Sequence, residues 1–344
     1  MALYTNDGWL DFNYILSKGA WLNIVIGKRQ VGKTYGCLQL MLKRNFKFIL
    51  LRRTTAELKT ISASPDLNPF KPFEPDFKTG LFKSGEKLCN ISDYELDENG
   101  KAKEKETRGI VTSLAEISHI RGFNGSVFSE LVYDEFIPEK GVITRQTEGD
   151  SFLNAYTTIN GNRELNGNFP LRAWLLANSN RIDSPVLEAL NITDDILYMR
   201  RKGREELMTN KGVYICQPDS AIVTTARKQT ALMQQISSDS DFYSMALENE
   251  FSYDASPYIK QLPLKGMAPV WAYDGKLFCW HNPAGGYYIC RAAFNKGSRY
   301  GGSRVEREKL ANDFSILKPY YYAGLIAFSD LRAQALFKSI YGIE

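Results

Sequence analysis

An apolar run that leads directly into a basic, glycine-rich loop is the feature that most constrains the fold of this chain. Residues 21–34 have the sequence WLNIVIGKRQVGKT. They contain the complete pattern GxxxxGK[ST], with Gly27 and Gly32 as its glycines, followed by Lys33 and Thr34. An amphipathic helical pattern begins after the loop, with apolar residues at 37, 38 and 40–42. A strand, a tight loop and a helix in this order predict a phosphate-binding loop.

Each part of this loop has a chemical function in a nucleotide-binding site. The glycines let consecutive backbone N–H groups turn inward around phosphate oxygens, and the following helix adds the positive end of its dipole. Lys33 can reach the β- and γ-phosphates, and the Thr34 hydroxyl can ligate Mg²⁺. The alternative is an ordinary strand-turn-helix connection with coincidental glycines. We predict an ATP-binding loop made of Gly27, Lys28, Arg29, Gln30, Val31, Gly32, Lys33 and Thr34.

Two acidic residues at the end of a later apolar run supply a second part of such a site. Asp134 and Glu135 directly follow the apolar residues 131–133. Asp134 is predicted to hold Mg²⁺ through its water shell, and Glu135 to orient and deprotonate an attacking water. Because a kinase needs the metal carboxylate but no water-activating neighbour, the pair favours ATP hydrolysis. The alternative is an ordinary surface strand end, which often carries acidic residues. The assignment of this pair to a nucleotide site depends on the phosphate-binding loop that precedes it in the chain.

Two further polar residues are candidates for catalysis. Asn178 ends the apolar run 173–177, where P-loop ATPases with a catalytic glutamate commonly carry a residue that senses the γ-phosphate. Capping of a turn or helix is the alternative for Asn178. Arg163 lies in the polar segment INGNRELNG and is a candidate finger that reaches the γ-phosphate of a neighbouring subunit. A solvated arginine is the alternative there.

The apolar runs together predict the fold class α/β, a P-loop NTPase of the ASCE type with a mainly parallel sheet flanked by helices. They span residues 21–26, 46–51, 131–133, 173–177 and 213–216. We predict three parts, which are an ATPase domain over 1–219, a helical linker over 220–256 and a small C-terminal β-rich or α+β domain over 257–344.

Two segments have a distinctive composition. Residues 64–108 combine four prolines with the charged stretch KAKEKETR, which predicts an insertion with an exposed hairpin and not sheet core. In the C-terminal part, Asp274-Gly275 between two apolar runs predicts a hairpin, and residues 329–342 have a helical pattern.

The net charge of +4, from 43 basic and 39 acidic residues, does not indicate a nucleic-acid partner, so any DNA contact has to be local. Local basic clusters give candidates for phosphate-backbone contact, with ordinary solvated side chains as the alternative. The DNA-binding candidates are Arg52, Arg53, Lys101, Lys103, Lys105, Arg299 and Arg304.

The cysteine and histidine content argues against a zinc site and a disulfide framework. The five cysteines are widely spaced without a CxxC pair, and His119 and His281 are the two histidines of the chain. No apolar stretch reaches the length of about 18 residues that a membrane span requires. The sequence therefore predicts a soluble protein with free thiols and no membrane partner.

With these motifs in this order, the chain resembles the double-stranded-DNA packaging ATPases, or terminase-like motors, of small tailed phages that replicate by protein priming. The resemblance rests on several strings and covers most of residues 20–190. They are IVIGKRQVGKT, the strand end Leu51-Arg52-Arg53 with Glu57-Leu58 after it, VYDEFIPEK at 132–140, NRE at 162–164 and LLANSNRIDSP at 175–185.

The resemblance implies a homomeric ring, pentameric by expectation, mounted on the portal vertex of a procapsid. ATP, with Mg²⁺, would drive double-stranded DNA through its central pore, and a packaging RNA would lie between motor and shell. The expected location is the host cytoplasm and, transiently, the portal vertex, with the protein absent from the mature virion. Relatives can carry further arginines just before the NRE segment, where this chain has Gly161 and Asn162.

The resemblance also implies that the C-terminal domain is a vestigial RNase H-like nuclease. Asp274 is the one acid among residues 270–294, whereas two-metal cleavage needs several convergent carboxylates. Nuclease activity is therefore not expected. Two other functions stay open, namely a cellular FtsK/HerA-type or AAA+ DNA-remodelling ATPase, and a non-hydrolysing scaffold that uses nucleotide only to gate its assembly.

Overall fold

The computed structural model describes residues 2–63, 65–84, 88–117, 125–138, 147–179, 184–236, 243 and 258–343. The chain divides into two compact units, Met1–Tyr253 and Asp254–Glu344. The helical segment expected at 220–256 begins as α8 (Ala221–Lys228) and α9 (Ala231–Gln235). Residues 237–242 and 244–256 of that segment lie outside the described residues, and the three-part division stays a prediction.

The first unit is built on a nine-stranded sheet with the strand order β3-β4-β5-β2-β6-β7-β1-β9-β8. The six strands from β5 to β9 in this order pair in parallel, whereas β3, β4 and β8 join antiparallel to their neighbours. The strands are β1 (Leu22–Gly27), β2 (Phe48–Arg52), β3 (Thr79–Lys83), β4 (Leu88–Leu96), β5 (Ala102–Ser113), β6 (Glu130–Asp134), β7 (Arg172–Asn178), β8 (Glu206–Met208) and β9 (Val213–Cys216).

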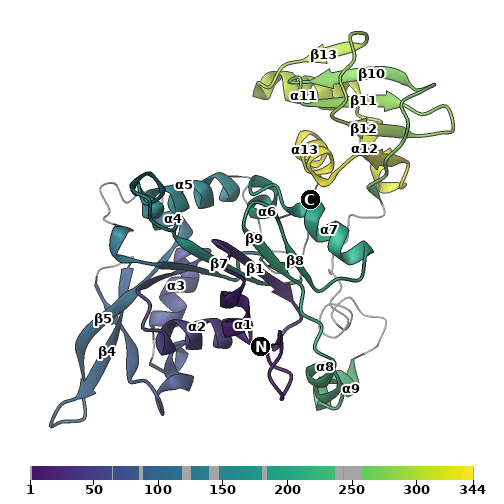
Figure 1. Cartoon of the computed structure of the whole chain (residues 1–344). Helices are drawn as coiled ribbons and strands as arrows, with labels where there is room; N and C mark the ends of the chain where they lie inside the picture. Colours follow the sequence, from purple (N-terminus) through teal and green to yellow (C-terminus); the bar gives the residue numbers. More distant parts are fainter. Residues whose placement is uncertain are drawn as a thin grey trace. The chain divides into compact units, whose positions relative to one another are not determined.

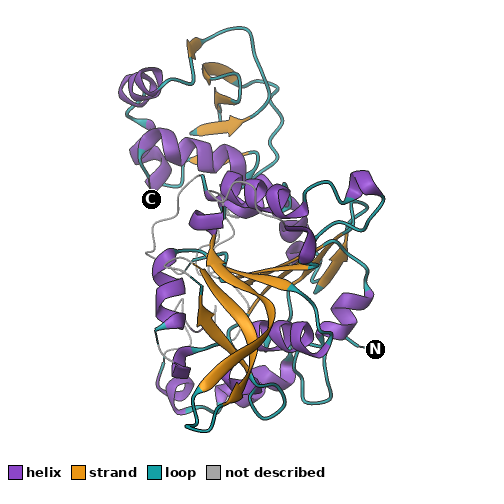
Figure 2. Ribbon diagram, turned by 90° about the vertical axis from the view of Figure 1, so that its left-hand side faces the viewer, coloured by secondary structure: helices purple, strands orange, loops and turns teal. Residues whose placement is uncertain are grey.

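Helices cover both faces of this sheet, as the two views in Figures 1 and 2 show. On one face, Val25, Leu50, Val132 and Trp174 join a buried cluster with the side chains of the first two helices. On the other face, Tyr133 stacks on Phe152 of α5 with ring centroids 5.8 Å apart. The helices are α1 (Phe12–Ser17), α2 (Lys33–Lys43), α3 (Thr55–Ser62), α4 (Leu114–Ile117), α5 (Glu148–Asn160), α6 (Pro185–Ala189) and α7 (Thr193–Arg201), followed by α8 and α9.

The central strands are buried along their whole length, which explains their continuous apolar sequences. Every residue of β1, β2, β6 and β9 is buried. A strand covered on both faces has no solvent side and therefore no polar alternation. The predicted mainly parallel α/β sheet flanked by helices is confirmed in the coarse sense that the large sheet is mixed and mostly parallel.

The expectation that residues 64–108 lie outside the sheet core is wrong. Strands β3 and β4 extend the sheet, and β5 pairs in parallel with β2 from Gly109 to Ser113. Cys89 and Ile91 of β4 are buried in the main core. Only the outer half of the β4–β5 hairpin is exposed, including residues 102–107. The expectation was based on the charged residues of this outer half, whereas the inner half of the same hairpin is buried and belongs to the sheet.

The second unit has a five-stranded sheet with the order β13-β10-β11-β12-β14. The predicted hairpin at Asp274-Gly275 joins β10 to β11, and the predicted C-terminal helix is α13. Trp271, Phe328 and Phe337 are fully buried in a separate core. The elements are β10 (Ala268–Tyr273), β11 (Leu277–His281), β12 (Tyr287–Cys290), β13 (Ser298–Tyr300), α11 (Arg304–Asp313), α12 (Leu317–Tyr322), β14 (Ile326–Phe328) and α13 (Leu331–Tyr341).

The five cysteines are buried and carry free thiols, three in the first unit and two in the second. None of the helices in the described ranges has the length and apolar character needed to cross a membrane.

Candidate functional site

The predicted loop, Asp134, Glu135 and Asn178 meet at the carboxyl edge of the parallel sheet. Strand β1 lies beside β7 with Gly27 opposite Asn178, and β6 lies on the other side of β7 with Asp134 opposite Leu176. Because the three strands run in the same direction, the loop after β1, the acids after β6 and the asparagine at the end of β7 are brought to one edge. Ligands of open α/β sheets bind at this edge.

The loop residue Lys33 makes contacts that fit a phosphate-binding lysine. Gly32 has the left-handed conformation, with φ of 86°, and caps α2, whose first residue is Lys33. The Lys33 ammonium donates to the carbonyl oxygens of Gly27, at 3.0 Å, and Lys28, and to Asn178 Oδ1 at 3.0 Å. Burial lowers the pKa of this ammonium to about 7, against the Asp134 charge, which raises it. A buried cation held by neutral oxygens is suited to receive an anion.

Thr34 and Asp134 lie side by side, and their oxygens fit a magnesium ion. Thr34 Oγ1 donates to Asp134 Oδ1 at 2.9 Å, and the other carboxylate oxygen of Asp134 lies 3.0 Å from Arg52 Nη1. Asp134 is 3% exposed. Mg²⁺ is bound in proteins through one or two oxygen side chains and substrate phosphates, and a hydroxyl beside a carboxylate is such a donor set. These two residues could therefore hold the metal.

Glu135 has a conformation different from that of its buried neighbours. Its φ is +56°, in the left-handed region that a residue with a side chain adopts at a cost of order 1–3 kcal/mol. The side chain is 61% exposed, and Oε2 lies 3.7 Å from Arg52 Nη1. The turn therefore directs a carboxylate out of the sheet edge and into solvent, where it can contact a water molecule.

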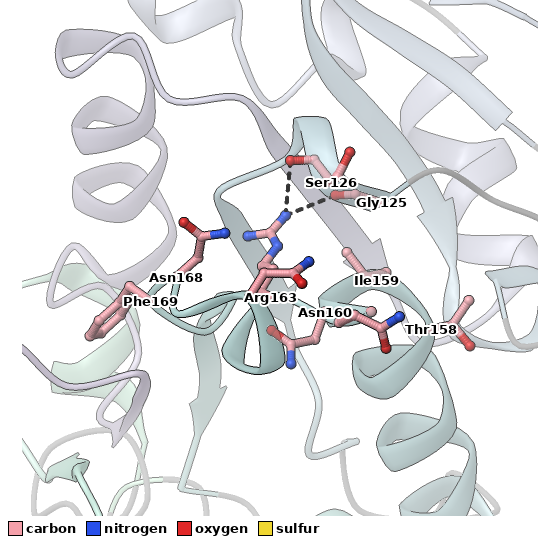
Figure 3. Close-up of a pocket in the computed structure, with 11 residues that line it drawn as sticks. Gly125, Ser126, Thr158, Ile159, Asn160, Arg163, Asn168 and Phe169 are labelled. Carbon is pink, nitrogen blue, oxygen red and sulfur yellow. Dashed lines mark hydrogen bonds between the residues drawn. The ribbon is translucent and has the colours of Figure 1, made fainter.

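Arg163 binds backbone carbonyls in its own subunit. Its Nη2 donates to the carbonyl of Gly125 at 2.9 Å, to that of Ser126 at 3.3 Å and to that of Phe128. Figure 3 shows the guanidinium of Arg163 directed at Gly125 and Ser126, in a pocket of about 540 Å³ that Asn160 also lines. Burial lowers the pKa of Arg163 below its usual range.

The location of Arg163 separates it from the other candidates. The carbonyls that it binds precede β6, and its own segment precedes β7, so it lies at the amino edge of these parallel strands. Asp134 and Asn178 lie at the opposite edge, about 20 Å away for strands of this length. Within one subunit, Arg163 therefore does not join the site. The trans role predicted for it stays a prediction.

The predicted DNA contacts of Arg52 and Arg53 are corrected by the structure. Both side chains are buried, and they form ion pairs with Asp134 and Glu148 at 3.0 Å. Because the guanidinium groups of Arg52 and Arg53 are buried in these ion pairs, they do not lie on a surface that the DNA backbone could contact. The other five candidates are exposed, although Lys105 pairs with Glu95 and Arg304 with Glu308, and their DNA contacts stay predictions.

Sequence reasoning missed a group of contacts behind the loop. The Lys28 ammonium is buried and contacts Asp219 and Thr224 Oγ1, so its side chain is directed away from the phosphate position predicted for the loop. Arg227 Nη1 donates to the carbonyl of Arg29 at 2.6 Å. These partners lie more than 190 residues apart in the chain, and no local pattern could have indicated them.

Parts of two strings that carried the resemblance, and His119, lie outside the described residues. The affected positions are 139, 140 and 180–183.

Comparison with known proteins supports the resemblance in both sequence and fold. The chain is 28% identical over 255 residues to a DNA packaging protein of Bacillus phage B103, covering 72% of this chain and 69% of that protein. No family model matches the chain.

Two solved structures have the same fold. The bacteriophage Phi-29 viral genome packaging motor assembly contains a chain with a TM-score of 0.63 and 20% identity, covering 98% of this chain and 100% of that one. The Phi-28 gp11 DNA packaging motor matches with a TM-score of 0.62 and 16% identity, covering 99% of each chain. The fold is therefore that of phage packaging-motor proteins. The resemblance to the phage DNA-packaging ATPases is confirmed.

Proposed function

We propose that this chain hydrolyses ATP and uses the energy to move double-stranded viral DNA into a preformed procapsid. The observation that carries this proposal is the meeting of Lys33, Thr34, Asp134 and Asn178 at one edge of the sheet, joined by hydrogen bonds of 2.9–3.0 Å. Glu135 adds an exposed carboxylate beside them. The similarity to a DNA packaging protein supports the choice of DNA as the partner.

In this proposal each residue has a separate task. The backbone of residues 27–34 and the Lys33 ammonium hold the β- and γ-phosphates, and Asn178, already in contact with Lys33, senses the γ-phosphate. Thr34 and Asp134 hold Mg²⁺, which neutralises phosphate charge when bound. The Glu135 carboxylate accepts a proton from the water that attacks the γ-phosphorus. The bond from that phosphorus to the bridging oxygen breaks, and ADP and inorganic phosphate leave.

The assembly is also part of the proposal. We infer a homomeric ring, of five subunits by expectation, that binds the portal and procapsid and holds a packaging RNA. It acts in the host cytoplasm and transiently at the portal vertex. Arg163 would contact the site of a neighbouring subunit. The second unit, as a vestigial RNase H-like domain without nuclease activity, would dock or guide the motor.

The test is phosphate release by wild type, Lys33→Ala and Glu135→Gln, each measured with and without double-stranded DNA and procapsids. Wild type should turn over ATP faster with both additions, and each variant should lose at least 100-fold, the order expected for removal of a catalytic group. Glu98→Gln is a matched control, since Glu98 is exposed in the β4–β5 turn. Unchanged turnover in Lys33→Ala or Glu135→Gln would disprove the site.

The same assay separates the two alternatives. DNA stimulation that is independent of procapsids would favour a cellular DNA-remodelling ATPase. Tight ATP binding without phosphate release, even with DNA present, would select a nucleotide-gated scaffold.

A further inference from the structure

The pocket that contains Arg163 lies at the amino edge of the central strands, away from the proposed ATP site (Figure 3). Its walls come from the end of α5, from the loop that joins α5 to β7, and from residues 125 and 126. The volume of about 540 Å³ is within the range of pockets that hold small organic ligands. Among the described residues that line the pocket, Arg163 is the one cation and Phe169 the one aromatic residue.

The guanidinium of Arg163 is held in place by one of its nitrogens, and the other two are accessible to a ligand. Nη2 donates to three backbone carbonyls, including that of Gly125 at 2.9 Å. Within the described part of the chain, Nε and Nη1 make no hydrogen bond and no carboxylate pairs with Arg163, and solvent reaches both atoms. They carry three N–H donors in fixed directions. A guanidinium held in this way is suited to bind the oxygens of a phosphate.

Asparagine side chains supply the pocket with both donors and acceptors. Asn162, Asn166 and Asn168 line it, and their side-chain amides make no hydrogen bond to any residue in the described ranges. Each amide donates through its NH₂ group and accepts through its oxygen. The edges of nucleobases carry donors and acceptors side by side, and asparagine pairs with adenine through two hydrogen bonds. A carboxylate ligand would use only the donors of these amides, so the lining favours a base.

The ring of Phe169 gives the pocket a surface on which a base can stack. This ring lines the pocket and is 53% exposed. The Arg172 guanidinium lies over it, 5.2 Å from the ring centroid. Exposed aromatic rings together with arginine groups bind the bases of single strands, because every base has a flat face that can stack.

We propose that this pocket binds one unstacked nucleotide unit, with the phosphate on Arg163 and the base on the asparagine amides and Phe169. The unit belongs to a single-stranded nucleic acid or is a free mononucleotide, since both present the same phosphate and base. A base inside a duplex does not fit, because its edge is paired and its faces are stacked. The proposal goes beyond the proposed function and does not depend on it, since Lys33 and Asp134 lie at the opposite edge of the sheet.

The test measures how tightly the full chain binds short, fluorescently labelled single-stranded RNA and DNA of one sequence, by anisotropy at several salt concentrations. Arg163→Gln should weaken binding about tenfold. Its salt slope should be smaller by about 0.7, the value for one phosphate contact in a single strand. Phe169→Ala should weaken binding about fivefold or more through the loss of stacking.

Matched variants separate this binding from other effects. Arg163→Gln also removes hydrogen bonds to three carbonyls, so Phe169→Ala, at a half-exposed side chain, tests the pocket independently. Lys59→Gln controls for charge, since Lys59 is exposed on α3. Leu165→Ala controls for Phe169→Ala, since Leu165 is 85% exposed in the same loop but does not line the pocket. Both controls, and Lys33→Ala, should bind the strands as wild type does.

Competition identifies the source of the nucleotide unit. AMP, added to the Lys33→Ala chain so that the proposed ATP site contributes little, should displace the strands, whereas a duplex of the same sequence should not. Binding of AMP without binding of either strand would assign the pocket to a free mononucleotide.

The proposal is overturned if Arg163→Gln or Phe169→Ala binds as tightly as wild type, or if wild type binds neither the strands nor AMP. It is also overturned if the duplex competes as well as the single strand, or a glutamate-containing peptide as well as AMP. Loss of ATP hydrolysis in Arg163→Gln with unchanged strand and AMP binding would overturn it and favour the trans role of Arg163. Loss of ATP hydrolysis in Lys33→Ala with unchanged strand binding keeps both proposals, and absence of hydrolysis in wild type overturns the proposed function alone.

Discussion

Arg52 illustrates how a single side chain at a strand end can be assigned to the wrong partner. Its positive charge, considered alone, predicts a DNA contact, whereas the parallel strand β6 brings Asp134 to 3.0 Å from it. The side chains of both residues are nearly buried, at 10% and 4% exposure. The positive charge of Arg52 therefore compensates the negative charge of the buried Asp134 carboxylate.

We predict that Arg52→Gln lowers the free energy of unfolding by about 3–5 kcal/mol, the usual cost of breaking a buried ion pair on one side. Chemical denaturation measures the change. Lys103→Gln, on the exposed hairpin, should change stability by less than about 0.5 kcal/mol. Equal small effects in the two variants would contradict the buried pair.

The buried carboxyl group of Glu130 should make the free energy of unfolding depend on pH. Burial raises the pKa of this carboxyl to about 7, although Arg172 at 2.9 Å and the Trp174 indole N–H at 2.7 Å oppose the shift. Because the pKa is higher in the folded than in the unfolded state, its stabilising contribution is complete below about pH 4.5 and is lost as the pH rises through 7.

We therefore expect that Glu130→Gln, compared with wild type, gains up to about 3 kcal/mol of relative stability between pH 4.5 and 8. Urea denaturation at both pH values measures this difference. Glu98→Gln, in the exposed hairpin turn, should follow the wild-type pH profile. A Glu130→Gln profile parallel to wild type would mean that Glu130 has no raised pKa.

At the scale of elements, strand β5 joins the insertion at residues 64–108 to the main sheet, because it pairs with β4 on one side and with β2 on the other. Gly109 lies opposite Phe48 in the parallel pairing of β5 with β2, and a Cβ on Gly109 would lie 2.0 Å from the Phe48 carbonyl oxygen. We predict that Gly109→Ala destabilises the first unit by about 3 kcal/mol, since a backbone atom must move. Thermal and urea unfolding would measure the loss.

Gly80→Ala in β3 is the matched control. A Cβ there would meet its nearest atoms, in Phe82 and Tyr94, at 3.5 Å, which is an ordinary contact. It should be neutral or slightly stabilising. If Gly109→Ala were tolerated equally well, residues 64–108 would not be joined to the sheet as described.

The exposed half of the β4–β5 hairpin keeps the DNA prediction testable. Lys101 and Lys103 are exposed there. If they contact DNA phosphates, the double variant Lys101→Ala/Lys103→Ala should bind double-stranded DNA more weakly, with a salt slope smaller by about two units. Binding titrations at several salt concentrations measure it. Lys78→Ala, exposed before β3, is the control, and an identical slope in all three proteins would remove the hairpin from the DNA surface.

The central strands could be predicted from the sequence because each is an apolar run covered on both faces. The loop at 27–34 and the acids 134–135 could be found because each directly follows such a run. The partners of these residues could not. Arg52 contacts Asp134 from the neighbouring strand, and Lys28 contacts Asp219, which lies 191 residues further along the chain. Such pairings depend on strand order, which local sequence patterns do not contain.

At the scale of the whole molecule, the chain has two units with separate cores. In the second unit, Phe337 packs on Tyr341, Phe328 and Tyr321 with ring centroids 4.5–5.9 Å apart. Phe337→Ala should lower the stability of this unit by about 3–5 kcal/mol. Calorimetric scans should therefore show one transition shifted and the other, which belongs to the first unit, unchanged.

The control is Val305→Ala, because Val305 is exposed on α11 of the same unit. This variant should have the same two transition temperatures as wild type. A shift of both transitions by Phe337→Ala would mean that the two units unfold as one cooperative body.

The position of Arg163 at one edge of the sheet, with the acids at the other, limits the symmetry of any assembly that joins them. A two-fold dimer buries the same surface on both subunits, so it can join Arg163 to Glu135 only if that one surface spans both edges of the sheet, and it then completes both sites at once. Contact between the arginine edge of one subunit and the acid edge of the next through two different surfaces is a head-to-tail arrangement, which forms a ring where the rotation between subunits closes. An open chain of such subunits has one incomplete site at one end and one unused arginine at the other until the last subunit closes the ring, so an incomplete ring always lacks one composite site.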